Sequence, residues 1–259
     1  MEENKYNPEG SPLREHQKKL LNLLIVFDRL CEDNGIVWWI DGGTLLGAVR
    51  HGGFVPWDDD IDVCVLRKDL PRIRKILREK APAPYAFKDS HSESDYTRMW
   101  PRFVDESCKV VRKDPATGKP VDDELWIDTF ALRPGCSKFK KFVDKLYGRC
   151  ARRIRGSIKD GTANLLLAYL LYPIALLGEG LVAIGGVLFH RDCLIHDFGV
   201  PFYHVQYPRE IFPIKKIAFE GYLFPAPADV DPYLKHIYGD WTKLPPEEKR
   251  RNHEIIFPE

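Results

Sequence analysis

The spacing of apolar residues switches repeatedly between a helical and a strand-like period, which predicts a mixed α+β protein. Residues 13–31 repeat their apolar positions as an amphipathic helix does, after a Ser11-Pro12 start signal and before a Gly35 stop signal. The same reasoning predicts strands at 36–41, 61–66, 85–88, 98–104, 109–112 and 125–132, a second helix from Asp69, a hairpin at 212–221 and a short helix at 231–238.

A long apolar run at 163–189 follows a strongly basic stretch at 138–159. The run is long enough to span a bilayer, but Pro173, its glycines and Glu179 interrupt it. A charge at bilayer depth costs about 2.5–3.5 kcal/mol, which disfavours a true span. Two alternatives stay open. One is a helical hairpin, broken near Pro173–Gly180, that is buried or faces a partner. The other is an element lying on a membrane surface beside its basic flank.

These elements predict one domain, with a core at about 14–135 and 200–253 and a helical, partly apolar insertion at about 138–195. The chain has a net charge of +1, 44% apolar and 30% charged residues, so no overall field favours nucleic acid. Six cysteines without a paired spacing predict reduced thiols. His190, Cys193 and His196 stand three apart, but a zinc site is disfavoured because no second pair is near. The polar N-terminus predicts no signal peptide and a cytoplasmic protein.

The candidate chemistry is concentrated between Asp41 and Val65. Gly42, Gly43 and Thr44 form a turn after a strand, and such turns present backbone N–H groups to phosphate. Asp60 and Asp62 are expected on one face of the next strand, with side-chain origins roughly 6–7 Å apart. There they can bind one small hard cation, although an acidic cluster is also typical of a solvated loop.

The residues between the turn and the aspartates add to this prediction. Arg50 offers a cation that pairs with phosphate, and Trp57 offers a stacking surface. Asp58 belongs to the same acidic cluster. Later in the chain, Asp128 stands alone in an apolar strand, where an unpaired charge is costly unless the strand lies at a solvated edge. Together these residues predict a nucleotide phosphate held between a glycine turn and a metal-bearing strand.

The stretch DGGTLLGAVRHGGFVPWDDDID resembles the signature of the LicD family, a branch of the nucleotidyltransferase fold that includes the fukutin-type proteins. Three later segments resemble the family as well: LWIDTFAL at 125–132, YPREIFPIKKIAFEG at 207–221 and YGDWTKLPPEEKRRNH at 238–253. The resemblance implies a nucleotidyltransferase-fold core with a small mixed sheet flanked by helices. It also implies that Asp128 joins Asp60 and Asp62 at a Mg²⁺ or Mn²⁺ ion, with Asp58 or Asp128 as the base.

By the same resemblance, the expected activity is a phosphotransferase. It would move a phospho-alcohol from a CDP-activated donor, such as CDP-choline or CDP-ribitol, to a sugar hydroxyl of a cell-surface glycan. The glycan would belong to lipopolysaccharide or teichoic acid biosynthesis and can be lipid-linked, so contact with the inner face of the membrane through 138–189 is expected. The alternatives are a nucleotidyltransferase that leaves the nucleotide on its acceptor, a non-catalytic membrane- or partner-binding protein, and a metal-dependent phosphodiesterase.

Overall fold

The computed structural model describes the following parts of the chain: 5–93, 96, 98–114, 118–136, 138, 140–141, 143–145, 166–252 and 255–257. Its helices are α1 (Pro12–Asp33), α2 (Gly42–His51), α3 (Leu70–Lys80), α5 (Leu166–Phe189), α6 (Pro208–Ile211), α7 (Val230–Tyr238) and the 3₁₀ turn η2 (Glu247–Lys249). Its strands are β1 (Trp38–Ile40), β2 (Asp62–Leu66), β3 (Tyr85–Lys88), β4 (Arg102–Lys113), β5 (Pro120–Pro134), β6 (Leu194–His196), β7 (Lys215–Phe219) and β8 (Tyr222–Ala226).

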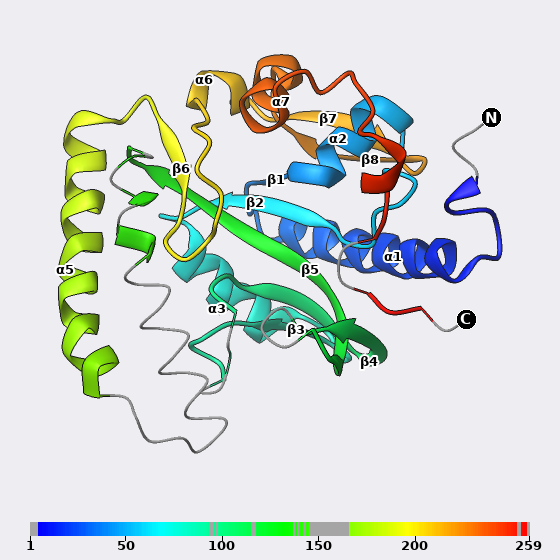
Figure 1. Cartoon of the computed structure of the whole chain (residues 1–259), viewed down its shortest axis with the longest axis horizontal. Helices are drawn as coiled ribbons and strands as arrows, with labels where there is room; N and C mark the ends of the chain where they lie inside the picture. The colour runs from blue at the N-terminus through cyan, green and yellow to red at the C-terminus, as the bar shows by residue number, and fades with distance from the viewer. Residues whose placement is uncertain are drawn as a thin grey trace.

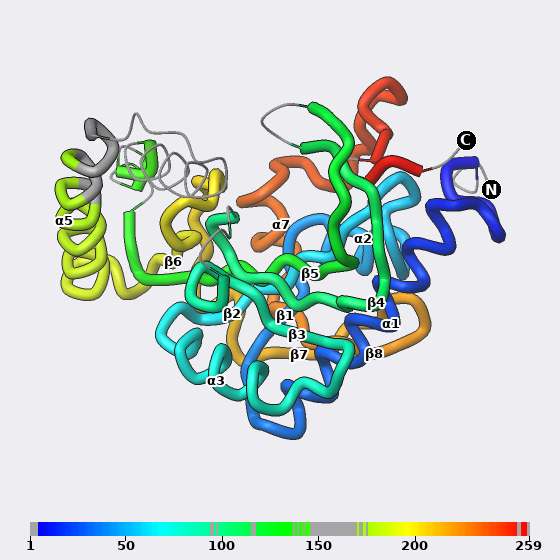
Figure 2. The backbone as a smooth tube through the Cα atoms, turned by 90° about the horizontal axis from the view of Figure 1, so that it is seen from below, coloured from blue at the N-terminus to red at the C-terminus, as the bar shows by residue number. Residues whose placement is uncertain are grey.

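A mixed sheet with the strand order β1-β2-β5-β4-β3 forms the centre of the molecule, and β6 also pairs with β5 (Figure 1). The β2–β5 pair is parallel, whereas β1–β2, β4–β5, β3–β4 and β5–β6 are antiparallel. β7 and β8 form a separate hairpin, and β8 lies against β1. Where β4 joins β5, the two strands project from the body of the molecule (Figure 2). The predicted α+β class, with a mixed sheet flanked by helices, is confirmed.

The first helix has the start signal and the apolar face that its sequence predicts. The Ser11 hydroxyl accepts a hydrogen bond from the backbone N–H of Arg14 at 3.2 Å. Leu20, Leu24 and Phe27 are buried, and α1 packs against β4 and β5. On the other side of the sheet, α2 contacts β2 and α7 contacts α2. The start of α2 therefore lies beside the first residue of β2, and this junction positions the candidate site.

The strand predicted at 98–104 and the one at 109–112 are a single strand in the structure. β4 runs from Arg102 to Lys113, with an irregular register between Asp105 and Lys109. The long, continuous β5 supplies hydrogen bonds to both parts, so the polar residues between them form a bulge in one strand.

The hairpin predicted near Pro173–Gly180 is wrong, because α5 is one helix from Leu166 to Phe189 with Pro173 inside it. A proline inside a helix removes one backbone N–H donor, but α5 continues through Pro173 as one helix. Gly178 and Gly186 mark close packing instead: a Cβ atom at Gly178 would touch Val143, and one at Gly186 would collide with the backbone of Pro134. Whether residues 138–195 form an insertion in a single domain stays a prediction.

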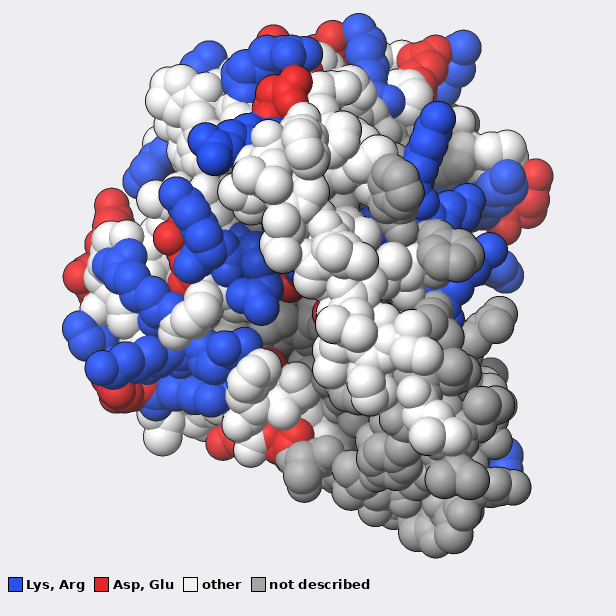
Figure 3. All heavy atoms as spheres, turned by 90° about the vertical axis from the view of Figure 1, so that its left-hand side faces the viewer, with Lys and Arg blue, Asp and Glu red and all other residues white. Residues whose placement is uncertain are grey.

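Helix α5 lies at one end of the molecule, far from the N-terminal part of α1 (Figures 1 and 2). Many of its large apolar side chains are exposed, including Leu177, Leu181 and Phe189. Uncharged side chains run through the middle of this face, and Lys and Arg side chains gather beside them (Figure 3). Among the residues that the structure describes, no helix combines the length and the apolarity that crossing a bilayer would require.

Candidate active site

The glycine turn and two of the predicted aspartates are in direct contact. Gly42 and Gly43 are the first two residues of α2, and Gly42 has a φ of +52°. A Cβ atom at Gly42 would lie 2.6 Å from Oδ2 of Asp62, and one at Gly43 would lie 2.6 Å from Oδ2 of Asp58. Only glycine leaves room for these carboxylates, because both distances are shorter than real Cβ contacts. The start of the helix is therefore shaped around the two acids.

The start of β2 is fixed by the same turn. The backbone N–H of Asp62 donates to the Thr44 hydroxyl at 2.9 Å, and Gly43 N–H donates to the Asp62 carboxylate. In the parallel β2–β5 pair, Asp62 stands directly opposite Asp128. Two residues far apart in the sequence are thus brought side by side on neighbouring strands. The structure brings Gly42, Gly43, Thr44, Asp62 and Asp128 together at the start of β2.

The other aspartates form a compact group just before the strand. One carboxylate oxygen from each of Asp58, Asp59 and Asp60 lies within 4.8 Å of the other two. The expectation that Asp60 and Asp62 share a strand face is wrong, because β2 begins at Asp62. Asp60 lies in the preceding loop, where its carboxyl group shares a hydrogen bond with Asp58.

Burial and mutual repulsion set the acidity of this group. Burial, together with the charges of Asp62 and Asp59, raises the pKa of Asp58 to about 7. Burial followed by the charge of Asp58 raises the pKa of Asp60 well above its usual value, and burial followed by the charge of Asp60 does the same for Asp62. Carboxylates gathered this closely favour a cation between them.

Asp128 is held by a different set of partners. Its Oδ1 accepts hydrogen bonds from Nε1 of Trp100 at 2.8 Å and from Nε of Arg102 at 3.0 Å. Its Oδ2 accepts from Nε1 of Trp126 at 3.3 Å. Arg102 is itself buried and lies over the ring of Trp126. Hydrogen bonds to both of its oxygens therefore fix the Asp128 carboxylate in place.

Three neighbouring segments hold the loop between α2 and β2 in place. Gln17 of α1 donates to the carbonyl of Asp58 at 2.9 Å, and the backbone N–H of Ile255 donates to the Asp59 carboxylate at 2.6 Å. Glu220, at the β7–β8 turn, accepts from the backbone N–H of Phe54 at 3.1 Å and pairs with Arg14 of α1 at 2.7 Å. The loop between α2 and β2 is thus tied to the helix and to both later segments.

The remaining two predicted residues point to other neighbours. Arg50 lies eight residues along α2 from Gly42, about 12 Å by helix rise, and it donates to the Trp241 carbonyl at 3.2 Å. Trp57 is buried with its ring edge-to-face against Tyr6, and Arg250 lies over it. These contacts do not bring Arg50 to the glycine turn. Trp57 lines a cavity of about 330 Å³ together with Tyr6, Arg250 and Arg251.

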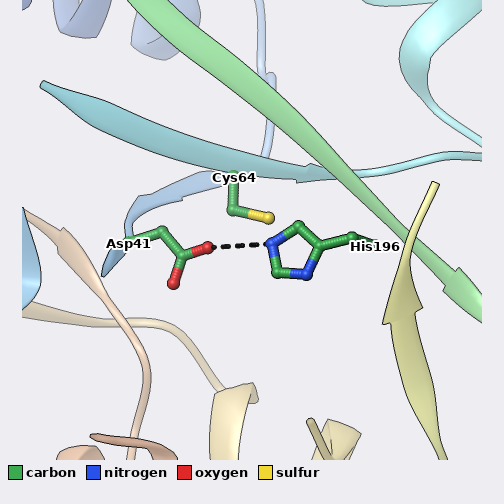
Figure 4. A group of neighbouring side chains, drawn as sticks. All are labelled: Asp41, Cys64 and His196. Carbon is green, nitrogen blue, oxygen red and sulfur yellow. Dashed lines mark ion pairs between the residues drawn. The ribbon is translucent and has the colours of Figure 1, made fainter. Parts of the chain in front are cut away.

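Sequence reasoning missed a buried group on the other side of the glycine turn. Asp41, the residue before α2, accepts a hydrogen bond from the Tyr233 hydroxyl at 2.8 Å, and its Oδ2 lies 3.6 Å from Nε2 of His196 (Figure 4). Cys64 completes the group, with ligand atoms within 4.8 Å of one another. An aspartate directly after a buried strand is costly without partners, and this signal could have identified Asp41 from the sequence.

The ionisation of this group differs from that of the acidic loop. Burial tends to raise the pKa of Asp41, but the neighbouring His196 and the Tyr233 hydroxyl outweigh it and lower that pKa. Burial raises the pKa of the Cys64 thiol well above its usual value, so it stays protonated and hydrogen-bonds to Asp41. Asp41 is therefore an ionised carboxylate, while the loop acids share protons.

A cavity of about 260 Å³ connects the two groups. Asp41, Gly42 and Asp62 form one side of it. The other side consists mainly of rings, and the residues there are Phe130, His196, Phe202, His204, Ile237 and Tyr238. Because Gly42 and Asp62 also belong to the glycine turn and the acidic group, the cavity opens directly beside the candidate site.

The donor set of the acidic group fits a hard divalent cation. Carboxylate oxygens are the ligands that Mg²⁺ and Mn²⁺ prefer, and several converge here beside a turn that leaves space for no side chain. Asp60 and Asp62 are the residues that would hold the ion, with Asp58 beside Asp60 and Asp128 opposite Asp62. Burial and mutual repulsion raise the pKa values of Asp58, Asp60 and Asp62, and a bound divalent ion would offset that repulsion.

Comparison with known proteins gives the same family as the motif. Residues 35–139 match the model of the LicD/FKTN/FKRP nucleotidyltransferase domain. The chain is 28% identical to the lipopolysaccharide cholinephosphotransferase LicD of Haemophilus influenzae, over 94% of this chain and 96% of that protein. It is 31% identical to the human ribitol 5-phosphate transferase FKRP over 28% of this chain and 18% of that protein. The resemblance to the LicD family that the sequence shows is therefore confirmed, and the matching domain covers residues 35–139.

Proposed function

We propose that the protein is a transferase that moves a phospho-alcohol to a hydroxyl group of a glycan. The observation that carries this proposal is the similarity, over nearly the whole chain, to a protein named as a lipopolysaccharide cholinephosphotransferase. The shorter match to a protein named as a ribitol 5-phosphate transferase supports the same class of reaction. The acidic residues expected for this chemistry are all present, and Gly42, Gly43, Asp58, Asp62 and Asp128 lie together.

The donor in this proposal is a CDP-activated alcohol. Gly42 and Gly43 present the first N–H groups of α2, and a helix N-terminus attracts phosphate. Beyond the acidic loop, Trp57, Arg250 and Arg251 line the cavity that we assign to the nucleoside side of the donor. An aromatic ring with cations beside it suits a base and a phosphate.

The reaction transfers the phosphorus that bears the alcohol. The acceptor hydroxyl oxygen bonds to this phosphorus, the bond to the CMP oxygen breaks, and the hydroxyl proton passes to a carboxylate. When bound, Mg²⁺ or Mn²⁺ would neutralise charge on the diphosphate and on the CMP leaving group. Asp58, rather than Asp128, is the base in this proposal, because Asp128 already accepts hydrogen bonds from Trp100, Arg102 and Trp126. Catalysis then rests on positioning and on electrostatics.

The acceptor is a glycan that can be lipid-linked, and residues 138–189 make a peripheral contact with the membrane that carries it. Exposed apolar side chains of α5 and exposed Lys138, Lys141 and Arg191 support this part of the proposal. Lipopolysaccharide or teichoic acid biosynthesis is the corresponding process, on the cytoplasmic face of the membrane.

The donor is tested by thermal denaturation with CDP-choline, CDP-ribitol, CDP-glycerol, CTP and ATP, each with Mg²⁺ and with EDTA. A ligand at about 100 times its dissociation constant adds about 2.7 kcal/mol to the free energy of unfolding. We expect stabilisation by a CDP-alcohol that requires Mg²⁺. Stabilisation by CTP or ATP alone would support nucleotidyl transfer instead, and no response to any nucleotide would support a binding protein.

The reaction is tested by its products. With a glycan acceptor, phospho-alcohol transfer releases CMP and adds the mass of the phospho-alcohol to the glycan. A nucleotidyltransferase would release pyrophosphate from CTP and add the mass of CMP. A phosphodiesterase would release CMP without any change in the glycan. Mass spectrometry of both products distinguishes the three reactions.

A further inference from the structure

A second cavity, lined by arginines, lies at the opposite end of β2 from the candidate site. It holds about 140 Å³, well below the roughly 300–1,000 Å³ of typical ligand pockets, and therefore suits a group as small as a phosphate. Arg67, which directly follows β2, lines it together with Arg74 of α3, Arg133 of β5 and Glu179 of α5. Because Asp62 begins β2, about 13 Å of strand separates the two sites. The proposed reaction therefore leaves this cavity without a role.

More positive than negative charge faces this cavity at pH 7. The arginines that line it are Arg67, Arg74, Arg98 and Arg133, and the aspartates are Asp89 and Asp197. Burial, followed by the charge of Asp197, raises the pKa of Glu179 to about 8, so its carboxyl group is largely protonated. Burial, followed by the charge of Arg74, lowers the pKa of His91, which leaves that ring largely neutral. The cavity therefore carries an excess of two positive charges.

The arginines also keep hydrogen-bond donors available. Nε of Arg67 lies 2.5 Å from Oδ2 of Asp197, and Nε of Arg74 donates to Oδ2 of Asp89 at 2.5 Å. Within the part of the chain that the structure describes, the terminal nitrogens of both arginines have no hydrogen-bond partner. A guanidinium presents its N–H groups as a planar fork that matches two oxygens of a phosphate. A phosphate in the cavity would thus receive donors that the two aspartates leave unused.

Glu179 joins this polar cavity to the apolar face of α5. Its Oε1 is buried and has no hydrogen-bond partner among the described residues, and a protonated carboxyl group can donate to a phosphate oxygen. On the same helix, Leu177 and Leu181 are 70% and 72% exposed. One helix therefore offers a polar group to the cavity and an apolar surface outside it. A molecule with an anionic head and apolar chains fits both.

We propose that this cavity binds the phosphomonoester or diphosphate head group of a membrane lipid, whose chains then lie along α5. A phosphomonoester carries a charge of about −1.5 to −2 at pH 7, which offsets the excess of positive charge, whereas a phosphodiester carries less. A diphosphate that joins a lipid to a glycan carries a comparable charge, so the cavity would hold the lipid end of such an acceptor. This assignment rests on the membrane contact in the proposed function and names the lipid chemistry that the contact recognises.

The first test shows whether phosphate binds at these arginines, and it needs neither donor nor acceptor. Inorganic phosphate is titrated calorimetrically at pH 7 in EDTA, so that no metal ion mediates its binding to the acidic group. We expect Arg67→Gln to weaken binding at least about tenfold, the effect of losing one hydrogen bond to a charged group. The Arg67 side chain is 41% exposed, so the substitution should leave the fold intact. Arg74→Gln should weaken binding as well, and Arg29→Gln, at an exposed arginine of α1 outside the cavity, is the matched control and should not.

The second test shows whether a lipid supplies the phosphate. Liposomes of phosphatidylcholine with phosphatidic acid, which is a phosphomonoester, are compared by co-sedimentation with liposomes that contain phosphatidylglycerol at the same surface charge. We expect stronger binding to phosphatidic acid. Arg67→Gln should remove this difference and keep the binding to phosphatidylglycerol, whereas Arg29→Gln should keep the difference.

The outcomes separate this assignment from the proposed function. If phosphate does not bind, or binds equally well to Arg67→Gln, Arg74→Gln and the unaltered protein, the cavity assignment is wrong and the transferase proposal is unaffected. If phosphate binding depends on both arginines but the two kinds of liposome bind equally well, the site takes a soluble phosphate and the lipid assignment is wrong. If neither kind of liposome binds, the membrane contact in the proposed function is wrong and the lipid assignment fails with it.

Discussion

Gly43 is the residue whose side-chain size most directly controls the acidic group, because a Cβ atom there would lie 2.6 Å from Oδ2 of Asp58. Its backbone is helical, so alanine is tolerated locally and even favoured by propensity. We expect Gly43→Ala to lower turnover at least about tenfold, roughly 1.4 kcal/mol in the activation barrier, because the Asp58 carboxylate must move. Steady-state kinetics together with the melting temperature would measure this.

The control for this substitution is Gly180→Ala in α5. Nothing lies within 4 Å of a Cβ atom at Gly180, so this variant should keep full turnover. Unchanged kinetics in Gly43→Ala would show that the contact with Asp58 has no part in the reaction. A large fall in the melting temperature of Gly43→Ala would instead mean that the substitution lowers turnover by disrupting the fold.

Asp60 and Asp62 are the second pair of residues whose role can be measured directly. Asparagine keeps the shape of each side chain and removes its charge, so Asp60→Asn and Asp62→Asn should abolish turnover. Each should also reduce the stabilisation that Mg²⁺ gives to the folded protein. Asp33→Asn, at the exposed end of α1, is the control. Full activity in both site variants would contradict the metal assignment.

The residues of the site divide into those that the sequence could predict and those that it could not. Gly42, Gly43, Asp58 and Asp62 lie within 21 consecutive positions, so the local pattern of turn, loop and strand brings them together. Asp128 was predictable because an unpaired charge in an apolar strand is costly. Trp57 was placed by its spacing alone, and spacing does not show that its ring packs on Tyr6.

His196 illustrates what the sequence could not reveal. It lies 155 positions after Asp41, and its place is set by the pairing of β6 with β5, in which it stands opposite Leu132. Its spacing from His190 and Cys193 raised only a zinc site, which the sequence disfavoured. Strand pairing over such a separation depends on the whole sheet and not on local periodicity, so the cavity beside the glycine turn was not predicted.

At the scale of elements, the loop before β2 should make stability depend on pH in a characteristic direction. Asp58 and Asp60 of this loop and Asp62, the first residue of β2, have pKa values in the folded protein above their unfolded values. The pKa of Asp58 is about 7, and those of Asp60 and Asp62 are well above the usual range. Unfolding therefore releases protons near neutral pH, and the folded state loses stability as pH rises. Glu179, whose pKa burial raises to about 8, adds to this trend.

We therefore expect the metal-free protein to lose stability between about pH 7.5 and about pH 8.5, where the unfolded histidines are largely neutral. The loss should approach about 1.4 kcal/mol per pH unit for each carboxyl group still protonated in the folded state. Chemical denaturation in EDTA would measure it, and Mg²⁺ should restore stability mainly at the higher pH. Asp60→Asn should flatten the dependence. A stability that rises over this interval in EDTA would contradict the proposed clustering of charge.

At the scale of the whole molecule, α5 presents an apolar face that the rest of the described chain does not cover. Leu177 and Leu181 are 70% and 72% exposed. Glu179, the acidic residue of this helix, lines an inner cavity with Arg67, Arg133 and Asp197. Its raised pKa keeps it largely protonated at pH 7, so it adds little negative charge to the outward face. A helix that is apolar around most of its circumference normally meets lipid or a protein core.

The charges around α5 favour an anionic lipid surface as the partner. Arg191 is exposed two residues after the end of α5, and Lys138, Lys141 and Lys145 are exposed in the segment that precedes this helix in the sequence. Lys and Arg side chains border the uncharged strip in Figure 3. Each basic residue near an anionic bilayer contributes about 1 kcal/mol, and exposed leucines add the burial of their apolar area. A lipid-linked acceptor would then be held at the same surface as the enzyme.

This prediction is tested by co-sedimentation with liposomes, because binding should need both the apolar face and the anionic lipid. We expect the protein to bind liposomes with phosphatidylglycerol more strongly than liposomes of phosphatidylcholine alone, and to lose part of this binding at high salt. Leu177→Glu and Leu181→Glu should abolish binding to the liposomes, because each substitution puts a charge on the face of α5 that enters the lipid. Leu223→Glu, at a leucine of β8 that is 60% exposed, should bind as the unaltered protein does. If all three variants bind equally, α5 does not contact lipid. If the unaltered protein instead forms dimers that Leu181→Glu disrupts, the apolar face joins two copies of the chain.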